Sequence, residues 1–247
     1  MLRRCFLAAA ALVGLLSLGL TAQAQTVITQ WNFNQTGFDV NSPAPSTGVG
    51  IASLLSGVTG SSASGTANGG SSDLGSPNTA WGTTGYPAQG TGSGTAGVRF
   101  DVSTVGFQDI VIQFDLRKSN TSSRWVELQY TTDGTNFTPF QQYQGPLGDT
   151  WFNNQIADLS AVAGVADNPN FGVRMVSIFD PAAAGVYTAS NTTSTYASTG
   201  TLRYDMVTFS GTAAAVPEPT TLALGGLGMG ITLVAYRIKR RRRGAKK

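Results

Sequence analysis

Residues 114–140, FDLRKSNTSSRWVELQYTTDGTNFTPF, contain the pattern that decides the fold. Within them, residues 126–130 (VELQY) alternate between apolar and polar side chains. This period of two is typical of a β-strand with one buried and one polar face. The dipeptide Asp133-Gly134 follows and favours a tight turn, so residues 137–143 are predicted to form the returning strand. The stretch therefore predicts an antiparallel hairpin.

The same alternation recurs on both sides of this hairpin. The further predicted strands lie at residues 27–33, 98–102, 110–116, 171–179 and 202–209. Because the first and last strands of such folds commonly pair, we expect Trp31 to lie near Tyr204 or Met206.

Two regions lack this pattern. Residues 41–97 are rich in Gly, Ser and Thr and contain several prolines, which predicts long loops with one or two short strands. Residues 161–165 are predicted to form a short helix with Ser160 as its N-cap.

Seven or eight short strands separated by turn-rich segments predict an all-β domain. We expect an antiparallel β-sandwich with jelly-roll-like topology, an N-terminal signal helix and a C-terminal transmembrane helix. The predicted segments are a signal peptide (1–24), the sandwich (25–211), a linker (212–219), a transmembrane helix (220–236) and a basic cytoplasmic tail (237–247).

The first 24 residues have the three parts of a secretory signal peptide. Two arginines precede an apolar segment at residues 6–20, and Ala22-Gln23-Ala24 is a cleavage signal that predicts a mature start at Gln25. The arginines partly match a twin-arginine signal, but the Leu-rich apolar segment favours the general secretory route.

The exported region, residues 25–216, is acidic although the whole chain has a formal net charge of +3. It contains six Lys or Arg against twelve Asp or Glu, because most basic residues lie near the two ends. This composition disfavours nucleic-acid binding. The chain has no histidine, and Cys5, its single cysteine, lies in the signal peptide, which excludes Cys/His metal sites and nucleophilic triads from the exported region.

The C-terminal residues combine three features in order. Pro217-Glu218-Pro219 is predicted to be extended, because proline disfavours helix both at its own position and at the residue before it. Residues 220–236 are mostly apolar and just long enough to span a bilayer, while the basic residues 237–243 favour a cytoplasmic end.

This order of motif, apolar segment and basic cluster resembles the PEP-CTERM sorting signal of bacterial envelope proteins. The resemblance implies that Pro217, Glu218 and Pro219 are recognised by an exosortase, a membrane-embedded protease that cleaves near the motif. The same type of tail has been labelled an ice-binding-protein C-terminal domain, which is no sign of ice binding here. An ordinary single-pass membrane anchor is the alternative.

The exported region also resembles the jelly-roll ectodomains found on PEP-CTERM proteins, which are similar to laminin-G-like and carbohydrate-binding modules. The stretches that carry this resemblance are residues 114–140, NPNFGVRMVSIF (168–179) and TLRYDMVTFSG (201–211). It implies a fold and leaves the activity open.

Trp125, Glu127 and Trp81 are the candidate glycan contacts. Trp125 and Glu127 are predicted to share the polar side of one strand, where an aromatic ring beside hydrogen-bonding groups suits a sugar. The alternatives are a solvated Glu127 and a Trp125 covered by the 41–97 loops. A glycosidase would pair Glu127 with an aspartate.

The sequence contains no metal-binding motif, so we expect the protein to have no cofactor. A structural calcium ion is the alternative. Asp205 is a candidate calcium or glycan ligand, or else an ion-pair partner of Arg203 or Arg174. A spatial oxygen cage could also form from Asp101, Asp109, Asp180 and Asn170.

These features predict an exported, non-enzymatic protein of the cell surface or extracellular matrix with a structural or adhesive role. Its expected partners are an exosortase, extracellular polysaccharide and, before processing, the membrane. A carbohydrate-binding module, with or without calcium, is the alternative, and a glycan-active enzyme that uses aspartates is a third.

Overall fold

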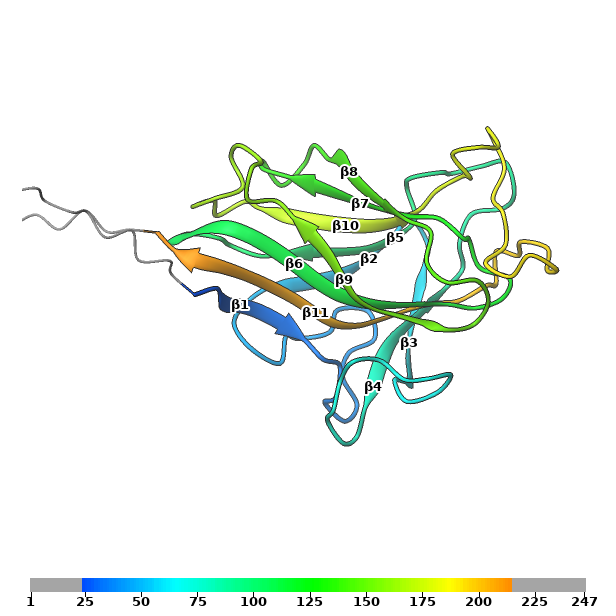
Figure 1. Ribbon diagram of the computed structural model, residues 1–247, viewed down its shortest axis with the longest axis horizontal. Helices are drawn as coiled ribbons and strands as arrows, with labels where there is room; N and C mark the ends of the chain where they lie inside the picture. The colour runs from blue at the N-terminus through cyan, green and yellow to red at the C-terminus, as the bar shows by residue number, and fades with distance from the viewer. Residues whose placement is uncertain (1–23, 215–247) are drawn as a thin grey trace, which may run out of the picture.

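The computed structural model describes residues 24–214, which form eleven β-strands and no helix (Figure 1). The strands are β1 (Thr26–Trp31), β2 (Ile51–Leu55), β3 (Thr59–Ser64), β4 (Thr79–Thr84), β5 (Gly97–Asp101), β6 (Phe107–Lys118), β7 (Val126–Thr131), β8 (Thr138–Tyr143), β9 (Trp151–Asp158), β10 (Gly172–Ser177) and β11 (Leu202–Ala213). Over this part of the chain, no helix long and apolar enough to cross a membrane is found.

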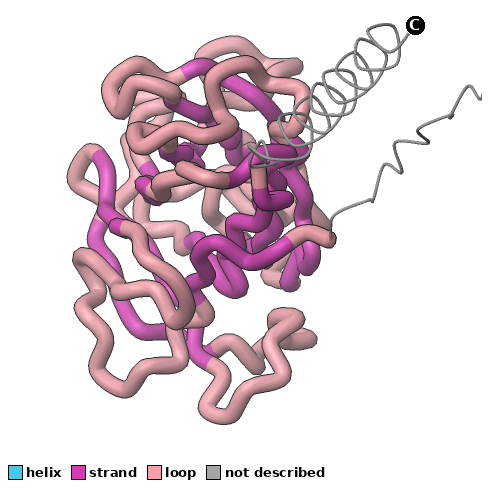
Figure 2. The backbone as a smooth tube through the Cα atoms, turned by 90° about the vertical axis from the view of Figure 1, so that its left-hand side faces the viewer, coloured by secondary structure: helices cyan, strands magenta, loops and turns pink. Residues whose placement is uncertain are grey.

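The strands form two antiparallel sheets that face each other, as predicted for a β-sandwich (Figures 1 and 2). The six-stranded sheet has the order β3-β4-β11-β6-β9, with β1 also paired to β11. The five-stranded sheet has the order β2-β5-β10-β7-β8. Non-consecutive neighbours such as β11 and β6 arise because the chain crosses repeatedly between the sheets.

Aromatic side chains fill the space between the sheets. Trp31 of β1, fully buried, contacts Phe100 of β5 and Phe209 of β11 with ring centroids 4.9 and 6.0 Å apart. Phe114 of β6 packs against Tyr143 of β8 at 5.0 Å. Edge-to-face pairs of this kind contribute about 0.5–1.5 kcal/mol each beyond the burial of their surface.

The first and last strands pair, as the sequence predicted. Trp31 lies opposite Val207, next to Met206, while Tyr204 lies opposite Trp81 of β4. A register shift between Asp205 and Thr208 divides β11, so that β4 pairs with its first part and β1 with its second.

Three expectations about local structure need correction. Residues 41–97 contain three complete strands, β2, β3 and β4, rather than one or two. Residues 159–165 form turns rather than a helix, with the Asp158 carboxylate accepting the Ser160 N–H. Strand β9 was not predicted, because a bulge opposite residues 114–116 and the left-handed Asn154 (φ +55°) interrupt its alternation.

The predicted signal helix, transmembrane helix and sorting motif lie outside the described residues. The predicted cleavage site between Ala24 and Gln25 immediately precedes β1. Both residues are exposed, and the Gln25 side chain donates to the Asp109 carbonyl and accepts from the Ser210 hydroxyl.

Candidate functional site

The outer face of the five-stranded sheet carries a row of polar side chains. Ser53, Arg99, Arg174 and Gln129 lie opposite one another across β2, β5, β10 and β7. Alternation explains this row, because their neighbours Val98, Val173 and Leu128 point into the core. The sheet thus presents one apolar and one hydrogen-bonding surface.

The side chains of Glu127, Gln129 and Gln142 form a hydrogen-bonded cluster at the β7–β8 side of this row. Both Glu127 and Gln129 of β7 are buried, at 9% and 5% exposure. The Glu127 carboxylate accepts from Gln129 Nε2 at 2.5 Å and from Gln142 Nε2, on the neighbouring β8, at 3.1 Å. Glu127 is therefore not the solvated strand carboxylate that one interpretation of the sequence expected.

This cluster borders an open groove of about 510 Å³. Residues of the loop after β10, including Phe179 and Asp180, form another part of the lining, together with Ser93 and Gly94. The Phe179 ring is held by an edge-to-face contact with Tyr187 at 4.7 Å. The groove thus combines amides and carboxylates with an aromatic side chain.

Asp180 is fixed in its charged form. Its carboxylate accepts from the Ala182 N–H and the Thr188 hydroxyl, both at 2.9 Å. The hydrogen bond from the Ala182 backbone is the main cause that lowers the pKa of Asp180 below its ordinary value. Asp180 therefore acts as a hydrogen-bond acceptor at neutral pH.

The two arginines of the row are already engaged. Arg99 donates two hydrogen bonds from Nε and one from Nη2 to the Asp101 carboxylate. Arg174 Nε donates to Gln129 Oε1 at 2.6 Å. Their guanidinium carbons lie 5.0 Å (Arg99) and 4.4 Å (Arg174) from the Phe137 ring centroid, so both cations stack on this side chain.

Trp81 does not contribute to this face. It is fully buried between the sheets, packs against Phe33 and Phe100, and donates its indole N–H to the Val40 carbonyl. A ring with no accessible surface cannot stack on a sugar, so the prediction of Trp81 as a glycan contact is wrong. Trp125, the other aromatic candidate for a glycan contact, is half-buried just before β7 and does not line the groove.

The groove residues that sequence reasoning missed are Gln142, Phe179 and Ser93. Gln142 lies on the predicted returning strand, where it faces Glu127 across the hairpin. The sequence predicts this strand but not the exact pairing, because a bulge between Leu128 and Gln129 shifts the register. Phe179 and Ser93 reach the site through irregular loops, for which the sequence offers no periodic signal.

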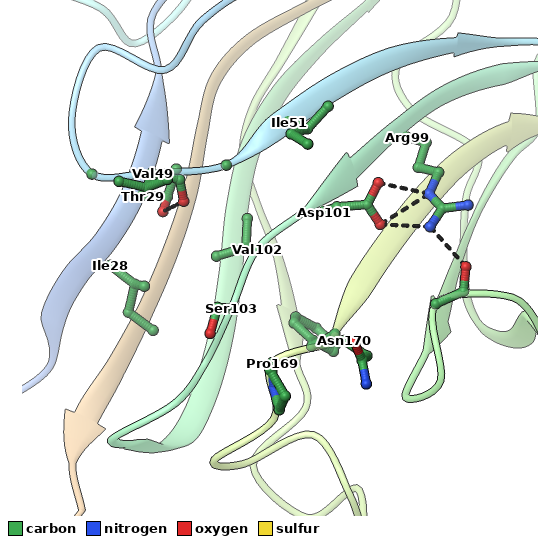
Figure 3. Close-up of a pocket in the computed structure, with 14 residues that line it drawn as sticks. Ile28, Thr29, Val49, Ile51, Arg99, Asp101, Val102, Ser103, Pro169 and Asn170 are labelled. Carbon is green, nitrogen blue, oxygen red and sulfur yellow. Dashed lines mark hydrogen bonds and ion pairs between the residues drawn. The ribbon is translucent and has the colours of Figure 1, made fainter.

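A second hollow, of about 640 Å³, lies at the end of the sandwich near the start of β1 (Figure 3). Ile28, Val49, Ile51 and Val102 line it, and the Arg99–Asp101 ion pair lies beside them. Its lining is mainly apolar, and its two charged side chains, Arg99 and Asp101, already pair with each other. This hollow is poorly suited to a hydroxyl-rich ligand.

Two carboxylates are buried in the six-stranded sheet, where Asp205 of β11 lies opposite Asp115 of β6. Asp115 accepts from the N–H groups of Ser72 (2.5 Å) and Asn154 (2.7 Å). Asp205 Oδ1 accepts from the Met206 N–H, whereas its Oδ2 is buried without a partner. Burial is the largest of the causes that raise the pKa of Asp205 to about 7.

The ion pairs expected for Asp205 do not form. Arg203 donates to the Ser64 carbonyl, and Arg174 to Gln129. Asp205 Oδ2 and Asn78 Oδ1 instead border the same space beside Gly65, where an added Cβ would approach them to 3.1 and 1.6 Å. The absence of a side chain at Gly65 thus lets the Asn78 amide pack closely against its backbone, beside Asp205 Oδ2.

The oxygen cage proposed from residues spread along the sequence does not assemble. Asp101 pairs with Arg99, the Asp109 carboxylate accepts from Thr212, and Asp180 belongs to the groove. Within residues 24–214, no group of three or more His, Cys, Asp or Glu side chains is placed to hold a metal ion.

The described residues form an antiparallel β-sandwich with a hydrogen-bonding groove on its outer face. Residues 215–243 match the family model described as the PEP-CTERM protein-sorting motif. The chain therefore carries an exosortase-type sorting signal and is an exported protein of the cell envelope or extracellular space.

Two solved structures are similar to the chain. One is the CBM22-1 xylan-binding domain from Paenibacillus barcinonensis Xyn10C, with 14% identity, coverage of 79% of this chain and 100% of that chain, and a TM-score of 0.39. The other is the K2 cleaved adhesin domain of Lys-gingipain, with 12% identity, coverage of 75% and 97%, and a TM-score of 0.35. Both are too distant to bear on ligand or mechanism, and no curated protein matches the chain.

Proposed function

We propose that the exported domain is a non-enzymatic adhesive or structural protein that holds extracellular polysaccharide in the groove beside Glu127. The observation that carries this proposal is the buried network of Glu127, Gln129 and Gln142 on an outer sheet face, next to the Phe179 ring. Sugar-binding sites need fixed hydrogen-bonding groups together with an apolar surface. The network holds its acceptors and donors in place before a ligand arrives.

Binding is favoured over catalysis by the state of the two groove carboxylates. A glycosidase needs one carboxyl group that stays protonated near neutral pH to act as the general acid. Asp180 is held ionised by its hydrogen bonds, and both oxygens of Glu127 accept from amide groups. Asp180 is therefore unsuited to act as the general acid.

Affinity electrophoresis of the protein recovered from the cell surface, through gels containing soluble polysaccharides, tests this proposal. We expect at least one polysaccharide to retard the protein, and Gln142→Ala and Phe179→Ala each to reduce the retardation. Gln108→Ala, on the exposed part of β6 in the other sheet, is the matched control and should migrate like the wild type. Release of reducing ends during incubation would instead indicate an enzyme.

We further propose that the precursor is anchored through residues 220–236 and cleaved near Pro217-Glu218-Pro219. The intact mass of the surface protein, in strains with and without the exosortase, tests this. A species from Gln25 to about Pro217 that depends on the exosortase is expected. Retention of the basic residues 240–243 in both strains would leave an ordinary membrane anchor.

A specific observation favours a structural calcium ion as a second proposal. Asp205 Oδ2 is a buried carboxylate oxygen without a partner, and buried charges are normally paired or bound to metal. Asp205, Asn78 and Ser71 would hold the ion, which prefers oxygen ligands and would supply the missing positive charge. The proposal is supported if CaCl₂ raises and EDTA lowers the melting temperature of the wild type, while neither changes that of Asp205→Asn. A wild-type melting temperature that is the same in CaCl₂ and in EDTA would exclude it.

A further inference from the structure

We infer that the groove beside Glu127 selects uncharged sugar chains and excludes polyanionic ones such as polyuronates and sulfated glycans. This inference rests on the proposed function, because it names the class of polysaccharide that the same site accepts. It follows from the charges around the groove.

The acidic side chains of Glu127 and Asp180 line the groove without a basic side chain beside them. Glu127 belongs to its lining and Asp180 to the loop beside it, and the lining includes no Lys or Arg. Two carboxylates beside the groove repel a third that enters with the ligand, because charges in direct contact lie well within the screening length of the solution. Neutral hydroxyl groups suffer no such repulsion and can donate hydrogen bonds to both.

Arg99 and Arg174, the two cations of the polar row, are not free to compensate, and Arg124, whose charge helps to lower the pKa of Asp180, donates to the Ala189 carbonyl. Arg99 is neutralised by Asp101, with an Nη2–Oδ1 distance of 2.7 Å, and it also donates to the Gly134 carbonyl. Arg174 stacks on Phe137 and donates to Gln129, whose amide in turn donates to Glu127. The positive charge of Arg174 is therefore directed toward a carboxylate of the protein itself.

The surroundings add to this selection. The exported region has twice as many acidic as basic residues, twelve against six, so a polyanion approaches against the field of the whole domain. At physiological ionic strength this field is screened beyond about 8 Å, whereas the contacts inside the groove are much less affected.

The test compares two panels of soluble polymers by affinity electrophoresis of the full exported protein. The neutral panel is mixed-linkage β-glucan, galactomannan and hydroxyethyl cellulose, and the anionic panel is polygalacturonate, alginate and dextran sulfate. We expect the tightest neutral polymer to bind at least about tenfold more strongly than any anionic one, and its binding to change less than about twofold between 50 and 500 mM NaCl.

The double variant Glu127→Gln, Asp180→Asn removes the two groove charges while keeping side-chain size. We expect it to weaken binding of the neutral polymer, whose hydroxyl groups lose two charged acceptors, and to strengthen binding of the anionic polymers, so that the difference between the panels narrows by severalfold. The control is Asp39→Asn, Asp158→Asn, which makes the same change in net charge at exposed carboxylates that do not line the groove and should leave the difference unchanged.

The outcomes separate the two proposals. Strong binding of an anionic polymer that is lost in Arg174→Gln would overturn the charge selection and leave polysaccharide binding intact. Binding of neither panel would overturn the proposed function and the inference with it. If the double variant fails to fold, the salt dependence of wild-type binding still tests the charge selection. Binding of an anionic polymer through Arg174 would weaken steeply as the salt concentration rises, and its observation would contradict the inference.

Discussion

Asp205 and Asp115 lie directly opposite each other on β11 and β6, and both are fully buried. Their environments differ, because backbone N–H groups satisfy both oxygens of Asp115 but only one oxygen of Asp205. Two like charges at one position in a sheet are destabilising unless one of them is neutralised. Asp205, with its raised pKa, is the carboxyl group of the pair that takes up a proton.

This arrangement predicts a pH-dependent stability in the EDTA-treated protein. The pKa of Asp205 is raised from 3.8 to about 7, so the folded state holds a proton that the unfolded state loses. The associated stability is fully present below pH 4 and is lost as the pH rises through 7, by about 4 kcal/mol at most. Urea unfolding from pH 4 to 8 should show this loss in the wild type and not in Asp205→Asn; equal slopes would contradict it.

Lys118 should be essential for stability despite lacking an acidic partner. Its buried Nζ donates to the carbonyl oxygens of Tyr143 and Gln144 at 2.6 Å and to that of Arg124. Lys118→Met leaves one buried and two part-buried carbonyls without a donor, which we expect to cost about 3 kcal/mol in urea unfolding. Arg203→Met, which removes one long hydrogen bond at 3.3 Å, should cost far less.

Trp81→Ala separates a core role from a binding role. Because Trp81 is fully buried, its truncation should destabilise the domain by about 3–5 kcal/mol. Below the unfolding transition, the folded fraction should still be retarded by polysaccharide. Phe179→Ala should show the reverse pattern, with lost retardation and a smaller change in stability. Loss of binding by folded Trp81→Ala protein would show that the groove depends on this ring.

Gly97 should not tolerate a side chain, because β5 approaches β10 closely there. A Cβ at Gly97 would lie 1.9 Å from the Met175 carbonyl oxygen, a backbone atom that can move only with its strand. Gly97→Ala should therefore reduce the free energy of unfolding by more than 2 kcal/mol, by roughly the cost of a strained core. Gly37→Ala is the control: its site is open, and its positive φ should cost about 1 kcal/mol.

The sequence predicts the sheets better than the site. The hairpin of β7 and β8 follows from alternation and a turn signal, and the pairing of β1 with β11 from the tendency of first and last strands to pair; both were confirmed. Strand β9 was missed because its bulge breaks the alternation, and Trp81 was misassigned because residues 79–84 are buried on both sides within the six-stranded sheet. The groove depends on loops, and Phe179 reaches Glu127 only through tertiary folding.

Strand β11 has a further consequence for biogenesis. It is the last segment of the domain to be translated, yet it lies inside its sheet and contacts β1, β4 and β6. The six-stranded sheet therefore cannot assemble until the chain is complete almost to the sorting motif at residues 215–243. A prematurely terminated chain therefore lacks both the central strand of the six-stranded sheet and the sorting motif.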